Sequence, residues 1–302
     1  MFDIIIPTYN NLEELKQCLS GLENQTYKNF KVFVCVDGSK DGTIEYLSDA
    51  SFNFEMQFIT HPGNENKGRN ETRNLAINKL ACKYLLMLDS DIIPSADLLK
   101  NHYELLNEKD CISVGEVIYT NSGENIWAKY LETRGKGKYR NLQEMPAYYL
   151  NTQNAAMLSE YYVKSGGQHP LLSRNYGGDD TEFGYRIGKE FDIPAVFNKN
   201  ACGYSFLEKS LKKALQQMEE FGRYNLKIIR EIHPEFKEIF NFNLLKENNI
   251  KSVIIRSLLR KDFAGLLKFP IDFLPDFLSL PAVHFLVFYS ICKGYKSAEA
   301  EK

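Results

Sequence analysis

Apolar and polar positions alternate along the first ninety residues with two different periods. Short runs rich in apolar, β-branched or aromatic residues predict β-strands at residues 2–6, 30–36, 54–60 and 84–88, and the last of these runs is continuously apolar. Between these runs, residues 11–22 and 70–80 repeat apolar positions every three or four residues, which predicts amphipathic helices. Strands that alternate with helices form right-handed βαβ units, and buried parallel strands are continuous apolar runs. The pattern therefore predicts an α/β, Rossmann-like, mainly parallel sheet with helices on both faces.

The pattern changes twice farther along the chain. Residues 93–205 mix strands, short helices and loops, whereas residues 207–232 are charged and have a helical period. Residues 277–292 form an uncharged apolar run that is shorter than the ~20 residues of a membrane-spanning helix. We therefore expect one domain over residues 1–205 and a helical C-terminal region over residues 206–302.

Composition narrows the class of protein. The 302 residues carry 37 basic and 39 acidic side chains, a net charge of -2. Nucleic-acid-binding domains are usually clearly basic, so we expect no nucleic-acid partner. The six cysteines include no Cys-x-x-Cys pair, which argues against a zinc ribbon or a thioredoxin-like site and favours reduced, buried thiols. The first apolar run is too short for a secretory signal, so we expect a cytoplasmic protein.

Polar clusters follow three of the predicted strands, at the point where each strand ends. They are Pro7-Thr8-Tyr9-Asn10, Asp37-Gly38-Ser39 and Asp89-Ser90-Asp91. Ligands bind outside the carboxyl ends of the strands in an open parallel sheet, so the clusters are expected to meet at one edge. A single aspartate in such a place is more often a helix cap or turn residue. Three clusters on one edge favour a binding site.

Asp89 and Asp91 are the most informative pair in these clusters. Two carboxylates two residues apart, directly after a buried strand, place hard oxygen ligands at the sheet edge. Mg²⁺ and Mn²⁺ prefer such ligands and complete their coordination with phosphate oxygens and water. The tripeptide is common by chance, so its position after the strand is what predicts a divalent metal.

Five stretches together resemble family 2 glycosyltransferases, which have the GT-A fold. They are IIIPTYN (4–10), VDGSKDGT (36–43), GRNETRNLAINK (68–79), YLLMLDSD (84–91) and GGDDTEFGYRI (177–187). A further stretch, residues 150–167, resembles the donor-sugar segment of that family. The stretches occur in family order and at family spacing. The resemblance implies a GT-A catalytic domain, with a nucleotide-binding half at residues 1–92 and an acceptor and catalytic half at residues 93–205.

The resemblance implies that the first two clusters bind the nucleotide of a UDP-sugar donor. Thr8 and Tyr9 would line the base and ribose, and Asp37 would accept a hydrogen bond from the uracil ring. Pro7 and Asn10 would complete this part of the site. Tyr9 could instead be a loop aromatic packed on the sheet, and Asp37 could cap the turn at Gly38.

The resemblance also assigns the residues near the diphosphate and the sugar. Asp89 and Ser90 would lie near the ribose, and Asp91, together with Asp89, would ligate the metal. Arg73 would face the nucleotide, although a surface ion pair on its helix is an alternative. Asn154 would contact the donor sugar or the acceptor.

Family 2 enzymes invert the anomeric centre, which requires one base for the proton of the attacking hydroxyl. The resemblance implies that Asp180 is this base, with Asp179 as the second candidate. Adjacent carboxylates raise one pKa by mutual repulsion. Gly177 and Gly178 would let the backbone approach the sugar closely. Asp179 and Asp180 also suit a helix N-terminus, and the two roles are compatible.

Two segments bear on the acceptor. Residues 127–140 combine Trp127 with tyrosines, basic residues and glycines, a composition that suits a sugar face and a phosphate but also a mobile loop. Residues 251–296 are apolar with more basic than acidic side chains, which favours contact with an anionic membrane over a helical cap or dimer interface. We therefore expect a saccharide acceptor, for example one linked to polyprenyl diphosphate, at the inner face of the cell membrane.

Two other functions fit parts of the pattern. A nucleotidyltransferase on a similar sheet would carry a Gly-rich phosphate loop where Pro7 to Asn10 stand. A catalytically inactive nucleotide-sugar-binding subunit would not need Asp89, Asp91 and Asp180 together. Many GT-A enzymes place a further metal ligand, often histidine, where residues 200–206 contain none. Either Asp91, phosphate and water would hold the metal, or the metal dependence would be weak.

Overall fold

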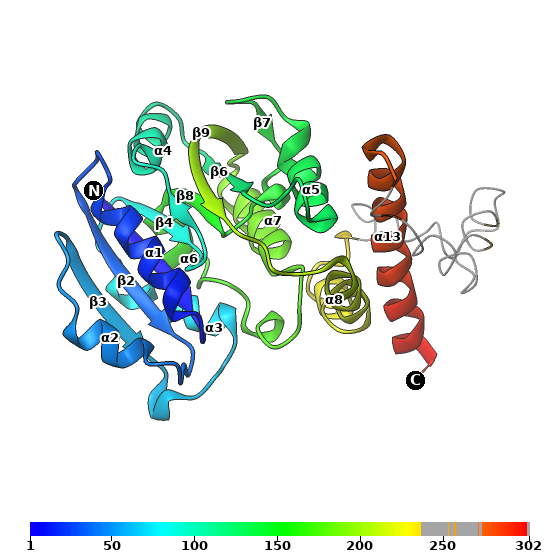
Figure 1. The fold of residues 1–302 in the computed structure, drawn as a ribbon, viewed down its shortest axis with the longest axis horizontal. Helices are drawn as coiled ribbons and strands as arrows, with labels where there is room; N and C mark the ends of the chain where they lie inside the picture. Colours follow the sequence, from blue (N-terminus) through cyan, green and yellow to red (C-terminus); the bar gives the residue numbers. More distant parts are fainter. Residues whose placement is uncertain (237–252, 254–256, 258–270, 272–273, 301–302) are drawn as a thin grey trace. The chain divides into compact units, whose positions relative to one another are not determined.

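The computed structural model describes residues 1–236, 253, 257, 271 and 274–300 (Figure 1). These residues form two compact units. The first unit contains residues 1–120, 132–174 and 179–207, and the second contains residues 121–131, 175–178 and 208–302. Both inner segments of the second unit, 121–131 and 175–178, fall within the single domain that the sequence predicts over residues 1–205.

A mixed β-sheet forms the centre of the first unit. Its strands follow the order β3-β2-β1-β4-β8-β6-β9-β5, and β7 pairs with β9. Their bounds are β1 Phe2–Thr8, β2 Phe30–Val36, β3 Glu55–Thr60, β4 Tyr84–Leu88, β5 Ile93–Pro94, β6 Ile112–Tyr119, β7 Glu144–Met145, β8 Asn154–Leu158 and β9 Ala195–Ser205. The four apolar runs expected to be strands are thus β1 to β4.

The parallel arrangement is confirmed for the N-terminal part of the sheet. β1 pairs in parallel with β2 and β4, and β2 pairs in parallel with β3. Beyond β4 the sheet is mixed, because β8 is antiparallel to both β4 and β6, while β6 and β9 are parallel. The sheet is therefore a Rossmann-like half extended by antiparallel strands.

Helices cover the sheet of the first unit (Figure 1). They are α1 Leu12–Glu23, α2 Thr43–Asp49, α3 Arg69–Asn74, α4 Leu98–Glu108, α6 Ser159–Lys164 and α7 Asp179–Phe191. The helix expected at residues 70–80 is shorter, because α3 ends at Asn74 and the chain continues as a 3-10 turn at Ile77–Lys79. The tightening begins where the Leu75 amide donates to the Thr72 carbonyl, three residues back.

The second unit is helical in the residues that the structure describes. It contains most of α5 (Ile126–Thr133), together with α8 (Leu211–Arg223), α9 (Asn225–Ile232) and α13 (Asp276–Ala300). Helices α8 and α13 pack closely, because a Cβ on Gly294 would lie 1.9 Å from the Glu219 carbonyl oxygen. The helical period predicted for residues 207–232 is confirmed. Of the seven basic residues in the tract at residues 251–296, five lie outside the described residues.

Candidate active site

The carboxyl ends of β1 and β4 are joined by side-chain hydrogen bonds. The Thr8 hydroxyl donates to Asn11 Oδ1 at 2.5 Å, and Asn11 Nδ2 donates to Ser90 Oγ at 2.7 Å. Thr8 and Ser90 are both buried. The first and third polar clusters of the sequence therefore meet at one sheet edge, as the strand order requires.

The second cluster joins the same edge through its loop. The Asn10 amide donates to Ser39 Oγ at 3.0 Å, and Asn10 Oδ1 accepts the Lys40 amide at 2.8 Å. Asn10 has a φ of 48°, a left-handed conformation that asparagine tolerates better than most residues. These bonds hold the residue before it, Tyr9, with 52% of its surface exposed. Tyr9 is therefore not a loop aromatic packed on the sheet.

Asp37 is buried at the end of β2, and its carboxylate binds backbone. Its oxygens accept hydrogen bonds from the amides of Lys67, at 2.7 Å, and Gly68, at 3.1 Å. His61 Nε2 lies 3.7 Å from Oδ1. Asp37 therefore holds the loop that leads into α3 rather than capping the turn at Gly38. Its contact with a nucleobase stays a prediction.

Arg73 and Asp89 form an ion pair inside the site. Arg73 Nη2 donates to Asp89 Oδ1 at 2.6 Å, and Nη1 donates to Gln168 Oε1 at 3.3 Å. The Arg73 side chain is almost fully buried. The alternative of a surface ion pair on its own helix is therefore wrong, since the partner lies after β4 and the pair is enclosed.

Asp179 and Asp180 begin α7 and have different partners. Asp179 is buried and accepts two hydrogen bonds from Arg69, at 2.6 and 2.8 Å. Asp180 remains partly exposed, and its Oδ1 accepts the Thr152 hydroxyl at 2.6 Å. Paired charges are the usual state of buried carboxylates, so Arg69 balances the charge of Asp179, whereas Asp180 is bound by a neutral hydroxyl.

The surroundings of Asp180 favour its protonated form. Burial raises the pKa of the Asp180 carboxyl to about 6, and repulsion from Asp179 acts in the same direction. The charges of Arg73 and Arg69 and the hydrogen bond from Thr152 act against this shift and lower the pKa. A carboxyl with a pKa near neutrality is suited to take a proton during a reaction.

Residues 151–153 connect the base candidate to the strand-end aspartates. Thr152 binds Asp180, and the carbonyl of Gln153 accepts the Asp89 amide at 3.1 Å. Asn151 fixes this turn, because its Oδ1 accepts the Gln153 amide at 3.0 Å. Residues 151–153 therefore contact both Asp180, the candidate base, and Asp89, a candidate metal ligand.

Asn154 is directed away from this edge, which corrects its expected sugar contact. It is 1% exposed, its Oδ1 faces His102 Nε2 at 2.9 Å, and its Nδ2 donates to the carbonyls of Glu116 and Ala201. Asn154 is the first residue of β8, and this strand lies between β4 and β6 in the sheet. Its polar atoms therefore stabilise the sheet interior.

Gly177, Gly178 and Trp127 also differ from the expectation. Gly177 and Gly178 have φ values of 90° and 83°, and a Cβ on Gly178 would lie 2.5 Å from Ile229 Cδ1. The close approach that requires glycine is therefore to a helix, not to a sugar. Trp127 is buried in α5 and stacks on Tyr130, so the segment expected to be a loop begins as a helix and encloses the indole.

The donor set at the end of β4 fits a hard divalent cation. Asp89 and Asp91 supply carboxylate oxygens, and both raise the pKa of the Cys18 thiol, after the larger effect of its burial. Within the described part of the chain, no group of three or more His, Cys, Asp or Glu side chains could hold a metal. A cation here would therefore need oxygens from its ligand and from water, as Mg²⁺ and Mn²⁺ usually have.

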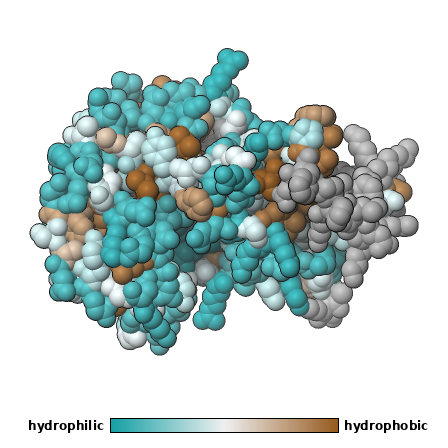
Figure 2. Space-filling model, in the orientation of Figure 1, coloured by the Kyte–Doolittle hydropathy of each residue, from teal (hydrophilic) through white to brown (hydrophobic). Residues whose placement is uncertain are grey.

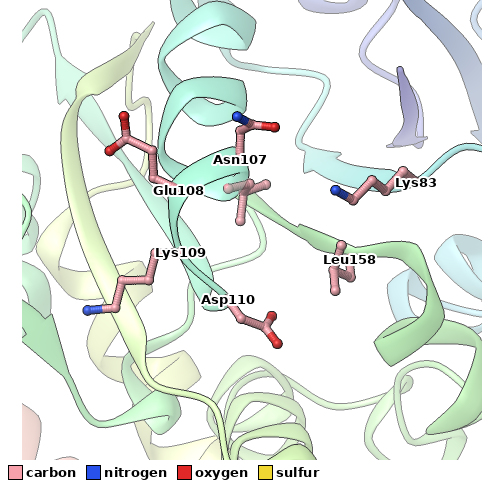
Figure 3. A pocket seen from close by; sticks show the side chains of 7 residues that line it. Lys83, Asn107, Glu108, Lys109, Asp110 and Leu158 are labelled. Carbon is pink, nitrogen blue, oxygen red and sulfur yellow. The ribbon is translucent and has the colours of Figure 1, made fainter.

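A surface pocket lies at the other edge of the sheet (Figure 3). Lys83, which precedes β4, and Leu158, which ends β8, line it together with residues 106–110. Tyr84 pairs with Leu158 in the β4–β8 ladder, four residues from Leu88, where the aspartates begin. The strand length therefore separates this pocket from the polar edge.

Sequence reasoning missed Arg69, Asn11, Thr152 and Gln153. Arg69 lies inside the stretch GRNETRN that carried the family resemblance, and Thr152 lies inside residues 150–167. The partner of Arg69 is Asp179, 110 positions away, and the partner of Thr152 is Asp180, 28 positions away. Spacing along the chain alone does not reveal such pairs.

Comparisons with known proteins identify the family of this chain. The model of glycosyl transferase family 2 matches residues 3–167. Glycosyltransferase GlyA of Streptococcus pneumoniae is 29% identical over 164 residues, 54% of this chain and 23% of that protein. A Methanococcus voltae protein is 24% identical to this chain, and the match covers 96% of each of the two chains. Its name is dolichyl N-acetyl-alpha-D-glucosaminyl phosphate 3-beta-D-2,3-diacetamido-2,3-dideoxy-beta-D-glucuronosyltransferase. The chain spans less than half of several relatives, including GlyA.

Solved structures support the same fold. Mannosyltransferase PcManGT from Pyrobaculum calidifontis, in complex with GDP-Man and Mn²⁺, has a TM-score of 0.66 at 15% identity, over 100% of this chain and 87% of that one. S. aureus TarS in complex with UDP-GlcNAc has a TM-score of 0.54 at 16% identity, over 99% of this chain and 91% of that one. With the family match over more than half of the chain, the protein belongs to glycosyl transferase family 2 and has the GT-A fold.

Proposed function

We propose that this enzyme transfers a sugar from a UDP-sugar to a hydroxyl of a saccharide acceptor, with inversion, and that Asp180 is the base. The observation that carries the proposal is the pairing around α7. Asp179 is neutralised by Arg69, whereas Asp180 is partly exposed, oriented by Thr152 and has a pKa raised to about 6.

In this mechanism Asp180 takes the proton of the acceptor hydroxyl as the oxygen attacks the anomeric carbon. Thr152 engages Oδ1 and fixes the plane of the carboxylate, so that Oδ2 receives the proton. The nucleoside diphosphate leaves from the opposite side of the sugar. Arg73 is held by Asp89 and Gln168, which places a positive charge beside the donor end of the site.

The donor is proposed as a nucleoside diphosphate sugar bound at the edge formed by Pro7 to Asn10, Asp37 and Ser90. Exposed Tyr9 offers a ring face on which a base can stack. Asp91, with Asp89, would hold Mg²⁺ or Mn²⁺ against the diphosphate. That ion would supply positive charge that stabilises the leaving group.

The acceptor is proposed as a lipid-linked saccharide reached from the inner face of the cell membrane. The M. voltae relative, similar over 96% of both chains, is named for a dolichyl-linked saccharide phosphate acceptor. Helix α13 supports membrane contact, because Phe277 and Leu278 at its start are exposed.

Calorimetric titration of UDP, with and without Mn²⁺, tests the donor site. We expect Mn²⁺-dependent binding in the wild type and its loss in Asp91→Ala. GDP serves as the comparison nucleotide. If GDP binds more tightly than UDP, the proposed donor becomes a GDP-sugar instead of a UDP-sugar. If neither nucleotide binds under any condition, the donor site is refuted.

Turnover tests the base separately from the donor site. Hydrolysis of a panel of UDP-sugars and GDP-mannose, with water as acceptor, should fall by about 10²-fold or more in Asp180→Asn while UDP binding is retained. Equal turnover in the variant would exclude Asp180 as the base. Binding of the donor without turnover in either protein would favour a nucleotide-sugar-binding subunit.

A further inference from the structure

The four residues that precede the aspartate pair belong to the helical second unit. Residues 175–178 group with residues 121–131 and 208–302, although they are far from both in the sequence. The chain then continues without interruption into Asp179 and Asp180, the first residues of α7. The segment and the first turn of α7 are therefore joined directly by the backbone.

Asn225, at the start of α9, binds the backbone of this segment. Its Nδ2 donates to the carbonyl of Asn175 at 3.0 Å and to the carbonyl of Gly177 at 2.9 Å. Asn225 is fully buried. Each of its two amide hydrogens therefore has a backbone acceptor, and two points of the segment are held by one side chain. Buried hydrogen bonds of this kind are costly to lose.

Helix α8 contacts the segment at two further points. The Tyr176 amide donates to Glu220 Oε1 at 3.4 Å. A Cβ added to Gly178 would lie 2.6 Å from Phe221 Cε2. With the left-handed φ of Gly178, this contact leaves room only for glycine.

We propose that the C-terminal helices α8 and α9 position the catalytic base, and that Asn225 is the positioning residue. This inference rests on the proposed role of Asp180. Gly177 is three residues from Asp180, so a displacement of its carbonyl moves the start of α7 and the carboxylate with it. Misplacement of a catalytic group by about 1 Å can lower a rate on the order of 10²-fold. The helical unit is thus part of the catalytic machinery rather than an appendage.

Hydrogen–deuterium exchange on the full chain tests the contact without a substrate. Asn225→Ala should increase exchange in the peptide that covers residues 175–187. The matched control is Asn125→Ala, because Asn125 Nδ2 also donates to a backbone carbonyl of the second unit, that of Lys209. The control should leave that peptide unchanged. Unchanged exchange in the folded Asn225→Ala protein would overturn the proposal.

Turnover distinguishes positioning from stability. We expect Asn225→Ala to lower kcat for nucleotide-sugar hydrolysis at least tenfold while the Kd for UDP stays within about twofold, and Asn125→Ala to change neither. Raised exchange with unchanged kcat would also overturn the proposal. If Asn225→Ala does not fold, Phe221→Leu removes the ring beside Gly177 and Gly178 and should give the same pattern.

A failure of the proposed function can be distinguished from a failure of the positioning role of Asn225. If Asp180→Asn retains the turnover of the wild type, or the wild type hydrolyses none of the nucleotide sugars, the proposed function is what fails. The exchange experiment still decides whether Asn225 holds the segment before α7.

Discussion

At the scale of single residues, Thr152 and Asp179 set the protonation of Asp180 in opposite directions. Because the folded pKa of Asp180 is about 6, activity should rise with pH through that value as the base loses its proton. Thr152→Val removes a hydrogen bond that lowers the pKa and should move this acid limb to higher pH. Asp179→Asn removes a neighbouring negative charge and should move it to lower pH. The pH dependence of kcat/KM for nucleotide-sugar hydrolysis measures both.

The controls use the same positions. Thr152→Ser keeps the hydroxyl and should restore the limb to its wild-type position. Shifts of Thr152→Val and Asp179→Asn in the same direction would contradict this account of the site, since a common loss of structure moves both variants alike.

The residues also show how far sequence reasoning extends. Asp89 and Asp180 were predicted, because strand ends and family stretches mark them along the chain. Arg69 and Thr152 were not, because their importance comes from partners that only the folded chain supplies. Asn154 was predicted wrongly for a related reason. A polar residue at the start of a strand can face the sheet edge or the interior. Asn154 faces the interior, where its Oδ1 lies 2.9 Å from His102 Nε2.

At the scale of elements, the buried contact between α4 and β8 should leave a signature in stability. His102 of α4 is buried between Ser113 Oγ, 2.8 Å from Nδ1, and Asn154 Oδ1, 2.9 Å from Nε2. Burial lowers the pKa of His102 to about 4. The unfolded chain therefore binds a proton near pH 6.5 before the folded chain does, and stability falls as the pH drops from about 6.5 to 4.

Replacing His102 tests this directly. The His102→Gln variant should not show this loss of stability at low pH. The pH dependence of its free energy of unfolding should therefore differ from that of the wild type by up to about 1.4 kcal/mol per pH unit in that window. Urea unfolding at several pH values measures it. Asp180, whose pKa is raised, changes stability in the opposite sense between about pH 4 and 6. The comparison is therefore made in an Asp180→Asn background, and parallel pH profiles there would show that His102 is not the group responsible.

The elements themselves were largely predictable. Strands β1, β2 and β4 are rich in apolar residues, with β4 apolar throughout, and the helical period of α1 gives its buried face. The strands beyond β4 were not assigned one by one, and two of them, β5 and β7, have only two residues each, too few for a period. The shortened α3 was missed for a different reason. Apolar Leu75 and Leu80 continue the pattern, but the backbone hydrogen bonds tighten after Asn74.

At the scale of the whole molecule, the open question is what the C-terminal helix contacts. Helix α13 is long and apolar enough to cross a membrane over Asp276–Ala298, with a mean hydropathy of 1.4. Part of it is covered by α8, and Lys293 pairs with Glu219 of that helix. Its N-terminal end is different, because Phe277 and Leu278 are 74% and 47% exposed, and apolar residues gather there in Figure 2. Helix α13 is therefore docked on α8 and has an exposed apolar first turn, which is what the proposed membrane contact requires.

Vesicle binding separates this arrangement from a soluble helical cap. Full burial of an apolar side chain contributes about 1.5–3 kcal/mol, so Phe277→Ser with Leu278→Ser should weaken co-sedimentation with anionic vesicles at least tenfold. The matched control replaces Val163 and Leu171, which are 45% and 62% exposed in the first unit, and should bind as the wild type does. If the wild type does not sediment with vesicles, or if the control pair loses as much binding as the α13 pair, the membrane contact is not made by this helix. The packing of α13 on α8 is then its remaining role, and α8 in turn contacts the segment before Asp179 and Asp180.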